Sequence, residues 1–291
     1  MNGRIIKAIA GFYYVQSEEG VFSCKAKGIF RKDHIKPLVG DNVSFDVVSY
    51  DDKEGNVTAV APAKNRLIRP EVANVDQIFL IFSGTVPAPN YEMLNRYLVS
   101  VHDFGIPVCL IVNKTDLCTP EIEEEIRKNY ESAPFRMFFV SAKTGEGIAE
   151  LEAALQGKVT VLAGPSGVGK SSLVNLLCGE DRMETGTLSE RIERGKNTTR
   201  HAELFALSND TFICDTPGFT AIDIEGIEPE NLILYFDELV PFSLNCRFSN
   251  CAHMKEQDCA VKQAVREGLV SRSRYLAYRS IHTLLEENKK Y

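Results

Sequence analysis

The feature that most constrains this chain is a glycine-rich loop, GPSGVGKS, at residues 164–171. An apolar run precedes the loop at 159–163, and a segment with helical spacing of apolar residues follows at 170–177. Glycines between a strand and a helix let backbone N–H groups wrap a phosphate at the helix N-terminus. A coincidental glycine-rich turn does not explain this strand and helix context. The loop therefore predicts a nucleotide phosphate site.

Each residue of this loop has an expected part in the phosphate site. Lys170 is expected to reach the β- and γ-phosphates, and the hydroxyl of Ser171 is expected to bind Mg²⁺. The predicted nucleotide-binding residues here are Gly164, Pro165, Ser166, Gly167, Val168, Gly169, Lys170, Ser171 and Ser172.

Apolar runs alternate with helical patterns along the middle of the chain. Strands are expected at 75–82, 107–112, 137–140, 158–162 and 212–214. Helical patterns lie at 91–104, 121–130, 148–155 and 170–177. Strands that alternate with helices predict a mostly parallel sheet covered on both faces, an α/β fold.

A second motif predicts which base is bound. Asn113-Lys114-Thr115-Asp116 follows the expected strand 107–112. An Asp carboxylate accepts two hydrogen bonds from the N1–H and 2-amino groups of guanine, and adenine has neither donor. The stem of Lys114 can pack on the base, while Asn113 can brace the loop. Ser141-Ala142-Lys143 either completes this base pocket through a backbone N–H or is a chance tripeptide.

Two further segments predict a response to the γ-phosphate. Asp215 opens the sequence Asp-Thr-Pro-Gly, which ends at Gly218. Asp215 is expected to hold Mg²⁺ through water, and the N–H of Gly218 to contact the γ-phosphate. In the segment 195–200, GKNTTR, Thr198 or Thr199 can bind Mg²⁺, and the sequence does not decide between them. Such segments are ordered by GTP and released on hydrolysis.

The order of these motifs is unusual for a GTPase. The base motifs at 113–116 and 141–143 precede the phosphate loop, whereas ordinary GTPases have the phosphate loop first. A circular permutation explains this order, because it preserves the packed sheet while it relocates the termini.

The N-terminal segment has a different character from the middle of the chain. Residues 1–66 contain about five short apolar runs separated by turn signals, which predicts a small β-barrel. The basic stretch 24–36, CKAKGIFRKDHIK, is either a solvated loop or a phosphate-contacting loop of an oligonucleotide-binding (OB) barrel.

The C-terminal segment combines a Cys/His cluster with two expected helices. Cys246, Cys251, His253 and Cys259 lie within 14 residues, and Zn²⁺ favours four such ligands in a closed structural site. The alternative is a set of buried or redox-active thiols. The helices expected at 261–269 and 275–285 have basic faces, which are either solvated or in contact with RNA phosphates.

Composition excludes several classes of protein. The 291 residues are 44% hydrophobic and 25% charged, which excludes a mainly disordered chain. No apolar run approaches the length of a membrane span, and the N-terminus lacks a secretory layout. The formal net charge is −7, but both end segments are mildly basic. We therefore expect a cytoplasmic protein with no membrane partner. We also expect a monomer and no DNA partner.

The chain resembles the bacterial small-subunit-dependent GTPases of 30S ribosomal subunit maturation in its permuted motif order and in the two segments that flank it. The resemblance covers nearly the whole chain. It implies an OB-fold barrel at 1–66, a circularly permuted GTPase domain at 67–225 and a zinc-binding, largely helical domain at 226–291. It also implies GTP/GDP, the 30S subunit and its rRNA as partners, a role late in 30S assembly, and hydrolysis that the 30S subunit stimulates and couples to release.

The residue that orients the attacking water is left open by the sequence. Many GTPases place a Gln after the Asp-x-x-Gly motif, but Phe219 stands there in this chain. The resembled family commonly has a His before the paired threonines, where this chain has Asn197. His201 lies nearby, and its alternative role is a strand residue entering 202–207. We expect slow intrinsic hydrolysis.

Two other functions compete with the leading one. The first is a nucleotide-gated RNA-binding module with incidental hydrolysis, and the second is a GTPase of another RNA process such as tRNA modification.

Overall fold

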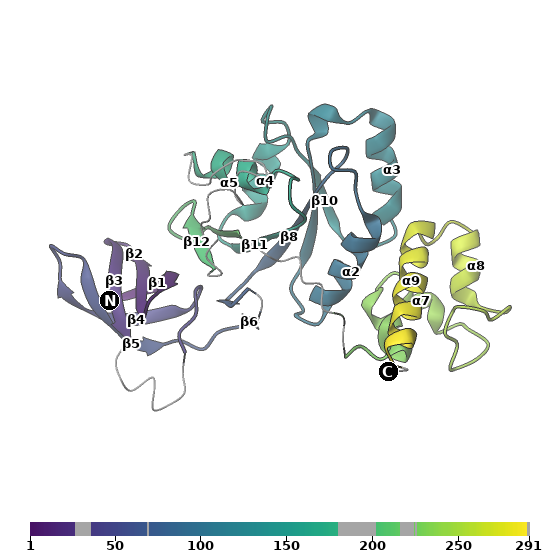
Figure 1. The fold of residues 1–291 in the computed structure, drawn as a ribbon, viewed down its shortest axis with the longest axis horizontal. Helices are drawn as coiled ribbons and strands as arrows, with labels where there is room; N and C mark the ends of the chain where they lie inside the picture. Colours follow the sequence, from purple (N-terminus) through teal and green to yellow (C-terminus); the bar gives the residue numbers. More distant parts are fainter. Residues whose placement is uncertain (27–35, 69, 180–201, 216–223, 225, 290–291) are drawn as a thin grey trace.

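A parallel sheet forms the centre of the molecule (Figure 1). The computed structural model describes residues 1–26, 36–68, 70–179, 202–215, 224 and 226–289. The parallel strands, in the order in which they lie side by side, are β10 (Arg136–Phe139), β9 (Val108–Asn113), β8 (Gln77–Ser83), β11 (Val159–Ala163) and β13 (Phe212–Asp215). These strands agree with the expected ones to within a residue or two at each end, and the predicted sheet is confirmed.

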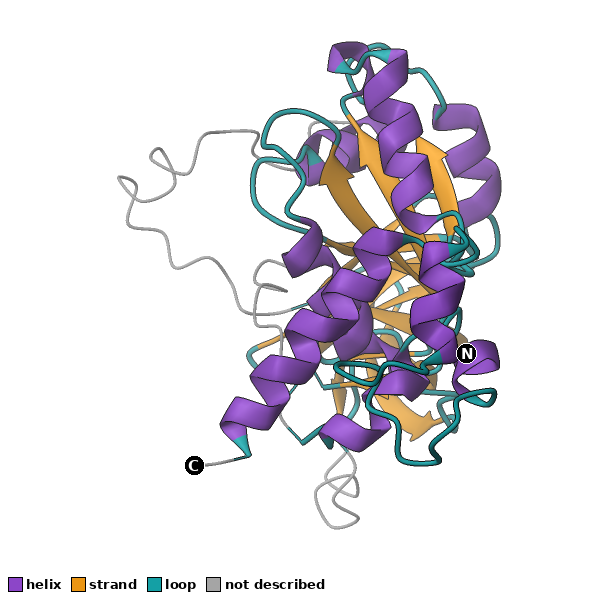
Figure 2. Cartoon of the chain, turned by 90° about the vertical axis from the view of Figure 1, so that its right-hand side faces the viewer, coloured by secondary structure: helices purple, strands orange, loops and turns teal. Residues whose placement is uncertain are grey.

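Helices cover both faces of this sheet (Figure 2). They are α2 (Tyr91–His102) and α3 (Pro120–Tyr130) on one face, and α4 (Ile148–Leu155) and α5 (Lys170–Cys178) on the other. Alternate residues of β8 show the arrangement: Ile78 and Leu80 pack toward α2 and α3, and Phe79 and Ile81 pack toward α4 and α5. A strand buried on both faces is apolar along its length, which explains the unbroken apolar runs in the sequence.

The N-terminal segment is a five-stranded barrel. Its strands are β1 (Asn2–Ile9), β2 (Phe12–Ser17), β3 (Gly20–Ala26), β4 (Asn42–Ser49) and β5 (Glu54–Val60). The pairing of β1 with β4 closes the barrel around fully buried Ile5, Val15, Phe22, Phe45 and Val57. The predicted barrel is confirmed, while 27–35 of the basic stretch 24–36 lies outside the described residues.

The barrel and the parallel sheet are continuous. Strand β12 (Glu203–Ala206) pairs antiparallel with β13 on one side and with β1 on the other, so that eleven strands of the described residues form one sheet. The connection between the two units is also packed. The side chain of Asn65 exchanges two hydrogen bonds with the backbone of Val75, at 2.8 and 2.9 Å. The guanidinium of Arg66 donates to the buried carboxylate of Asp41.

The C-terminal segment is largely helical, as predicted. Its elements are η2 (Pro229–Tyr235), α7 (Val240–Ser243), α8 (Ala260–Arg266) and α9 (Arg272–Asn288). This unit packs on α2 and α3 through α9 (Figure 1). Arg274 of α9 donates to Glu238 at 2.5 Å and to Asn95 of α2 at 2.6 Å. None of the helices within the described ranges is long and apolar enough to cross a lipid bilayer.

Candidate nucleotide site and metal cluster

The glycine-rich loop joins β11 to α5, and its backbone is packed closely against β8 and the first base motif. Gly164 has φ +140, and a Cβ at this position would collide with the carbonyl oxygen of Ile81. A Cβ at Gly169 would collide with the side-chain amide of Asn113. Glycine is therefore required at both positions for the loop to approach its neighbours.

Lys170 lies over the backbone of this loop. It is the first residue of α5, and its ammonium donates to the carbonyl oxygens of Gly164 at 2.8 Å and Pro165 at 2.7 Å. The N-terminal end of a helix carries partial positive charge from unpaired N–H groups. The ammonium and the helix end together create a positive site at the mouth of the loop, suited to an anion.

Asn113 and Lys114 connect the three nucleotide motifs. Asn113 is buried, and its amide donates to the carbonyl of Val168 at 2.8 Å and accepts from the N–H of Ala142 at 3.2 Å. Lys114 has a left-handed backbone with φ 66, and its ammonium donates to the carbonyls of Val86 and Gly167. The two side chains thus hold the phosphate loop and the 141–143 segment against the end of β9.

Asp116 is held in one orientation by the 141–143 segment. Its Oδ1 accepts from the hydroxyl of Ser141 at 2.7 Å, and its Oδ2 lies 3.7 Å from the ammonium of Lys143. The carboxylate side chain is 12% exposed, while Ser141 is fully buried. Each carboxylate oxygen can accept further hydrogen bonds. The sequence predicted a backbone N–H from this segment, but not that the Ser141 hydroxyl orients Asp116.

Thr115 and Ser172 complete the predicted nucleotide residues that the structure describes. The N–H of Thr115 donates to the carbonyl of Val140 at 3.2 Å, and its hydroxyl lies 3.4 Å from Glu146. These contacts link the base motif to the strand that precedes Ser141. Ser171 is half-buried and Ser172 is exposed in the first turn of α5.

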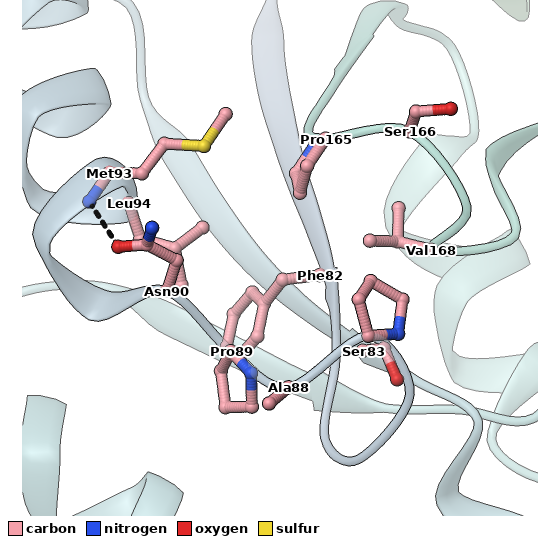
Figure 3. A pocket seen from close by; sticks show the side chains of 11 residues that line it. Phe82, Ser83, Ala88, Pro89, Asn90, Met93, Leu94, Pro165, Ser166 and Val168 are labelled. Carbon is pink, nitrogen blue, oxygen red and sulfur yellow. Dashed lines mark hydrogen bonds between the residues drawn. The ribbon is translucent and has the colours of Figure 1, made fainter.

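An apolar cavity of about 180 Å³ lies beside the phosphate loop (Figure 3). Pro165 and Val168 of the loop line one side, and Phe82 and Met93 line the other. Residues 113–116 and 141–143 do not line this cavity. The cavity therefore adjoins the phosphate end of the site rather than the base end.

The γ-phosphate segments are described only in part. Asp215 ends β13, and its backbone lies opposite Leu162 of β11 and Glu203 of β12. This pairing brings the start of Asp-Thr-Pro-Gly beside the strand that enters the phosphate loop. The other predicted residues lie outside the described part of the chain, namely Asn197, Thr198, Thr199, His201, Gly218 and Phe219.

The predicted metal ligands gather into one cluster. The sulfur atoms of Cys246, Cys251 and Cys259 and a ring nitrogen of His253 all lie within 4.8 Å of one another. The two sulfurs of Cys246 and Cys259 are 3.9 Å apart, and each is 3.5 Å from Nδ1 of His253. Tetrahedral Zn²⁺ with ordinary bond lengths separates such ligand atoms by about 3.5–3.8 Å. The cluster is compatible with one structural zinc ion.

Neighbouring groups fix the backbone that carries these ligands. The hydroxyls of Tyr275 and Tyr278 on α9 donate to the carbonyls of His253 and Ala252, at 2.8 and 3.0 Å. The carboxylate of Glu256 accepts from the N–H groups of Ala252 and Met254, both at 2.8 Å. No sequence pattern indicates this support, because α9 meets the backbone of the cluster only in the folded state.

Burial also sets the protonation of the cluster without metal. It raises the pKa of Cys251 to about 12 and lowers the pKa of His253 below its usual value. The imidazole is therefore neutral near pH 7, which is the form that binds a metal, whereas the thiol must lose a proton to do so.

Comparison with known families matches two segments of the chain. A family described as "RsgA N-terminal domain" matches residues 2–57, and a family described as "RsgA GTPase" matches residues 60–225. The second match alone covers more than half of the chain.

Individual relatives match over the full length. Proteins named "Small ribosomal subunit biogenesis GTPase RsgA" are 46% identical in Agathobacter rectalis and 43% identical in Caldanaerobacter subterraneus subsp. tengcongensis. These matches cover all of this chain and 100% and 97% of the respective relatives.

Two solved structures resemble the whole chain. YjeQ from Thermotoga maritima has a TM-score of 0.80 at 33% identity, with 98% of each chain covered. YloQ, described as a circularly permuted GTPase, has a TM-score of 0.78 at 34% identity, with 99% of this chain and 95% of that chain covered.

Proposed function

The chain belongs to the RsgA GTPase family, and on that premise we propose that it binds the small ribosomal subunit and acts late in its assembly. The protein is a GTP hydrolase. The proposal adds that the 30S subunit stimulates hydrolysis and that hydrolysis is coupled to release. The nucleotide part of the proposal is carried by the joining of three nucleotide motifs by Asn113 and Lys114. The ribosomal part is supported by the full-length similarity to proteins named for small ribosomal subunit biogenesis.

Guanine recognition is assigned to Asp116 and its supporting segment. The contact with Ser141 leaves the carboxylate in a fixed orientation before a base arrives. A preoriented acceptor loses little conformational freedom when it binds the N1–H and 2-amino donors of guanine. The stem of Lys114 and the backbone of Ala142 complete the proposed base pocket.

Phosphate binding is assigned to the loop 164–172 and to Lys170. In this proposal the ammonium of Lys170 exchanges its loop carbonyls for the β- and γ-phosphate oxygens. Ser171, Asp215 and either Thr198 or Thr199 would hold Mg²⁺, which supplies charge neutralisation for phosphoryl transfer. Gly218 would contact the γ-phosphate through its N–H.

Water activation is the slow part of the proposed reaction. Phe219 cannot hydrogen-bond the attacking water, and Asn197 can orient a water but cannot act as a base near neutral pH. His201 is a further candidate. We therefore propose that intrinsic hydrolysis is slow and that contact with the 30S subunit accelerates it.

The two end units are the proposed ribosome-binding parts. We propose a barrel at 1–66, a GTPase domain at 67–225 and a zinc domain at 226–291. One structural Zn²⁺ would be held by Cys246, Cys251, His253 and Cys259, in keeping with the distances between their ligand atoms. The mildly basic end units would contact rRNA phosphates, and the protein would act in the cytoplasm as a monomer.

GTP turnover in the presence of purified ribosomal particles tests this function. We expect 30S subunits to raise the turnover number well above the intrinsic value, and 50S subunits and 70S particles to have much smaller effects. Equal turnover with and without 30S would refute stimulated hydrolysis. If 30S binding still depended on the nucleotide, a nucleotide-gated RNA-binding module would be favoured. Absence of co-sedimentation with 30S would instead favour another RNA process.

A further inference from the structure

Strand β1 pairs with two different strands, β4 and β12, along one of its edges. Its first residues, Asn2 to Arg4, pair with β4 and close the barrel. Further along, Lys7 pairs antiparallel with Glu203 of β12. A register shift relative to β2 lies between Ile5 and Lys7. Irregularities of this kind bend a strand and redirect its side chains. The strand thus leaves the seam of the barrel and joins the GTPase sheet.

Side chains hold this junction at two points. The ammonium of Lys7 lies 2.9 Å from Oε1 of Glu203, with side chains 34% and 38% exposed. The guanidinium of Arg4 lies over the ring of Phe212, 4.9 Å from its centroid. Phe212 begins β13, so β1 contacts both of the last two strands of the GTPase sheet.

Successive pairs of neighbouring strands connect Lys7 to the nucleotide site. Glu203 lies opposite Lys7 on one side and opposite Asp215 on the other. Asp215 in turn lies opposite Leu162, which stands two residues before the phosphate loop. Neighbouring strands are about 4.8 Å apart, so three strand steps span roughly 14 Å from Lys7 to Leu162.

Strand β12 is short and depends on its neighbours for its position. It has four residues, and without β1 it would be the edge of the GTPase sheet. Short edge strands open readily, because they have few packed residues and backbone groups that water can reach. The pairing with β1 therefore restrains the strand that lies directly beside the backbone of Asp215.

We propose that Lys7 of the barrel is a positioning residue for GTP hydrolysis, acting through Glu203 on the sheet edge that carries Asp215. This inference rests on the nucleotide site proposed above. It makes the barrel a part of the hydrolytic machinery rather than only a binding module. By reciprocity, a ligand that shifts β1 and changes the affinity for GTP must have its own affinity for the barrel changed by GTP to the same degree.

Charge reversal tests the proposal in the full-length, zinc-loaded protein. The variants are Lys7→Glu, Glu203→Lys and the double exchange Lys7→Glu/Glu203→Lys. Each single variant replaces the attraction between the two side chains with a repulsion. Ion pairs that are this exposed contribute modest interaction energies, so we expect the single-turnover hydrolysis rate to fall about two- to tenfold. The double exchange restores the ion pair and should return the rate to within about twofold of the wild type.

GDP affinity separates positioning from general stability. GDP lacks the γ-phosphate, so its dissociation constant should stay unchanged in all three variants. Lys128→Glu serves as the matched control, because Lys128 makes an exposed ion pair with Glu124 on α3, away from β12. We expect this control to hydrolyse GTP at the wild-type rate.

Three outcomes would overturn the role of Lys7. They are an unchanged rate in Lys7→Glu, a failure of the double exchange to restore the rate, and a parallel loss of GDP affinity. A wild-type protein that failed to hydrolyse GTP would instead refute the proposed function, so the two failures are distinguishable.

Discussion

A buried ion pair between Arg274 and Glu238 lies inside the C-terminal unit, at its contact with the GTPase domain. The two side chains are 1% and 2% exposed, and the guanidinium also donates to Asn95 of α2. It stacks over the ring of Phe236, at 4.5 Å from the centroid. We predict that Arg274→Met destabilises the protein strongly, because the buried carboxyl group of Glu238 would lose the cation that compensates it.

The expected loss of stability follows from the burial of the two side chains. Removing one partner of a buried ion pair costs about 3–5 kcal/mol, whereas an exposed pair contributes about 0–1 kcal/mol. The expected loss is a large share of the roughly 5–15 kcal/mol by which folded domains are stable. In Arg274→Met/Glu238→Leu no charge is left behind, and apolar replacement of a buried pair is often nearly neutral. This double variant should therefore recover most of the loss.

Urea unfolding with two probes measures the effect. The chain contains no Trp whose fluorescence could follow unfolding, so far-UV circular dichroism serves as the probe of the whole fold. A chromogenic chelator reports zinc release from the C-terminal unit. Arg247→Met is the matched control, because Arg247 makes an exposed pair with Asp258 at 2.8 Å in the same unit. We expect zinc release to shift to lower urea in Arg274→Met and to stay nearly unchanged in Arg247→Met.

Two results would refute this reasoning. One is a loss of stability in Arg274→Met no larger than that in Arg247→Met. The other is a double variant as unstable as the single one, which would show that the uncompensated charge of Glu238 is not the cause.

Four further predictions concern the nucleotide and metal sites. Asp116→Asn should weaken GTP binding by about tenfold or more and improve xanthosine triphosphate binding, because xanthine has a carbonyl where guanine has its amino donor. Competition binding measures both affinities, and an unchanged preference for GTP would contradict the base assignment. Lys170→Ala should lower GTP hydrolysis by orders of magnitude with an unchanged circular dichroism spectrum, and retained turnover would place the phosphate site elsewhere. Cys251→Ser should lose stoichiometric zinc and unfold the C-terminal unit while nucleotide binding persists. Because the raised pKa of Cys251 favours the protonated thiol, a chelator should remove zinc from the wild type more easily as the pH falls, and elemental analysis after dialysis at several pH values would detect this.

The local chemistry of the GTPase core was predictable from the sequence. The strand–loop–helix pattern around Gly164 to Lys170 and the strand before Asn113 are both short-range features. Hydrophobic runs and glycine positions depend on neighbouring residues, so a single sequence carries them directly. The Cys/His cluster was predictable for the same reason, since its four members lie within 14 residues.

Contacts between distant segments were decided only by the tertiary structure. The sequence contains Lys7 and Glu203 but gives no signal that their strands pair, because strand partners are chosen by packing across the whole sheet. The same holds for Ser141 on Asp116, for the tyrosines of α9 behind the Cys/His cluster, and for Arg274 against Glu238. The sequence determined which chemical groups the protein has. Chain folding decided which of them act together, because that depends on long-range burial and backbone pairing rather than on neighbouring residues.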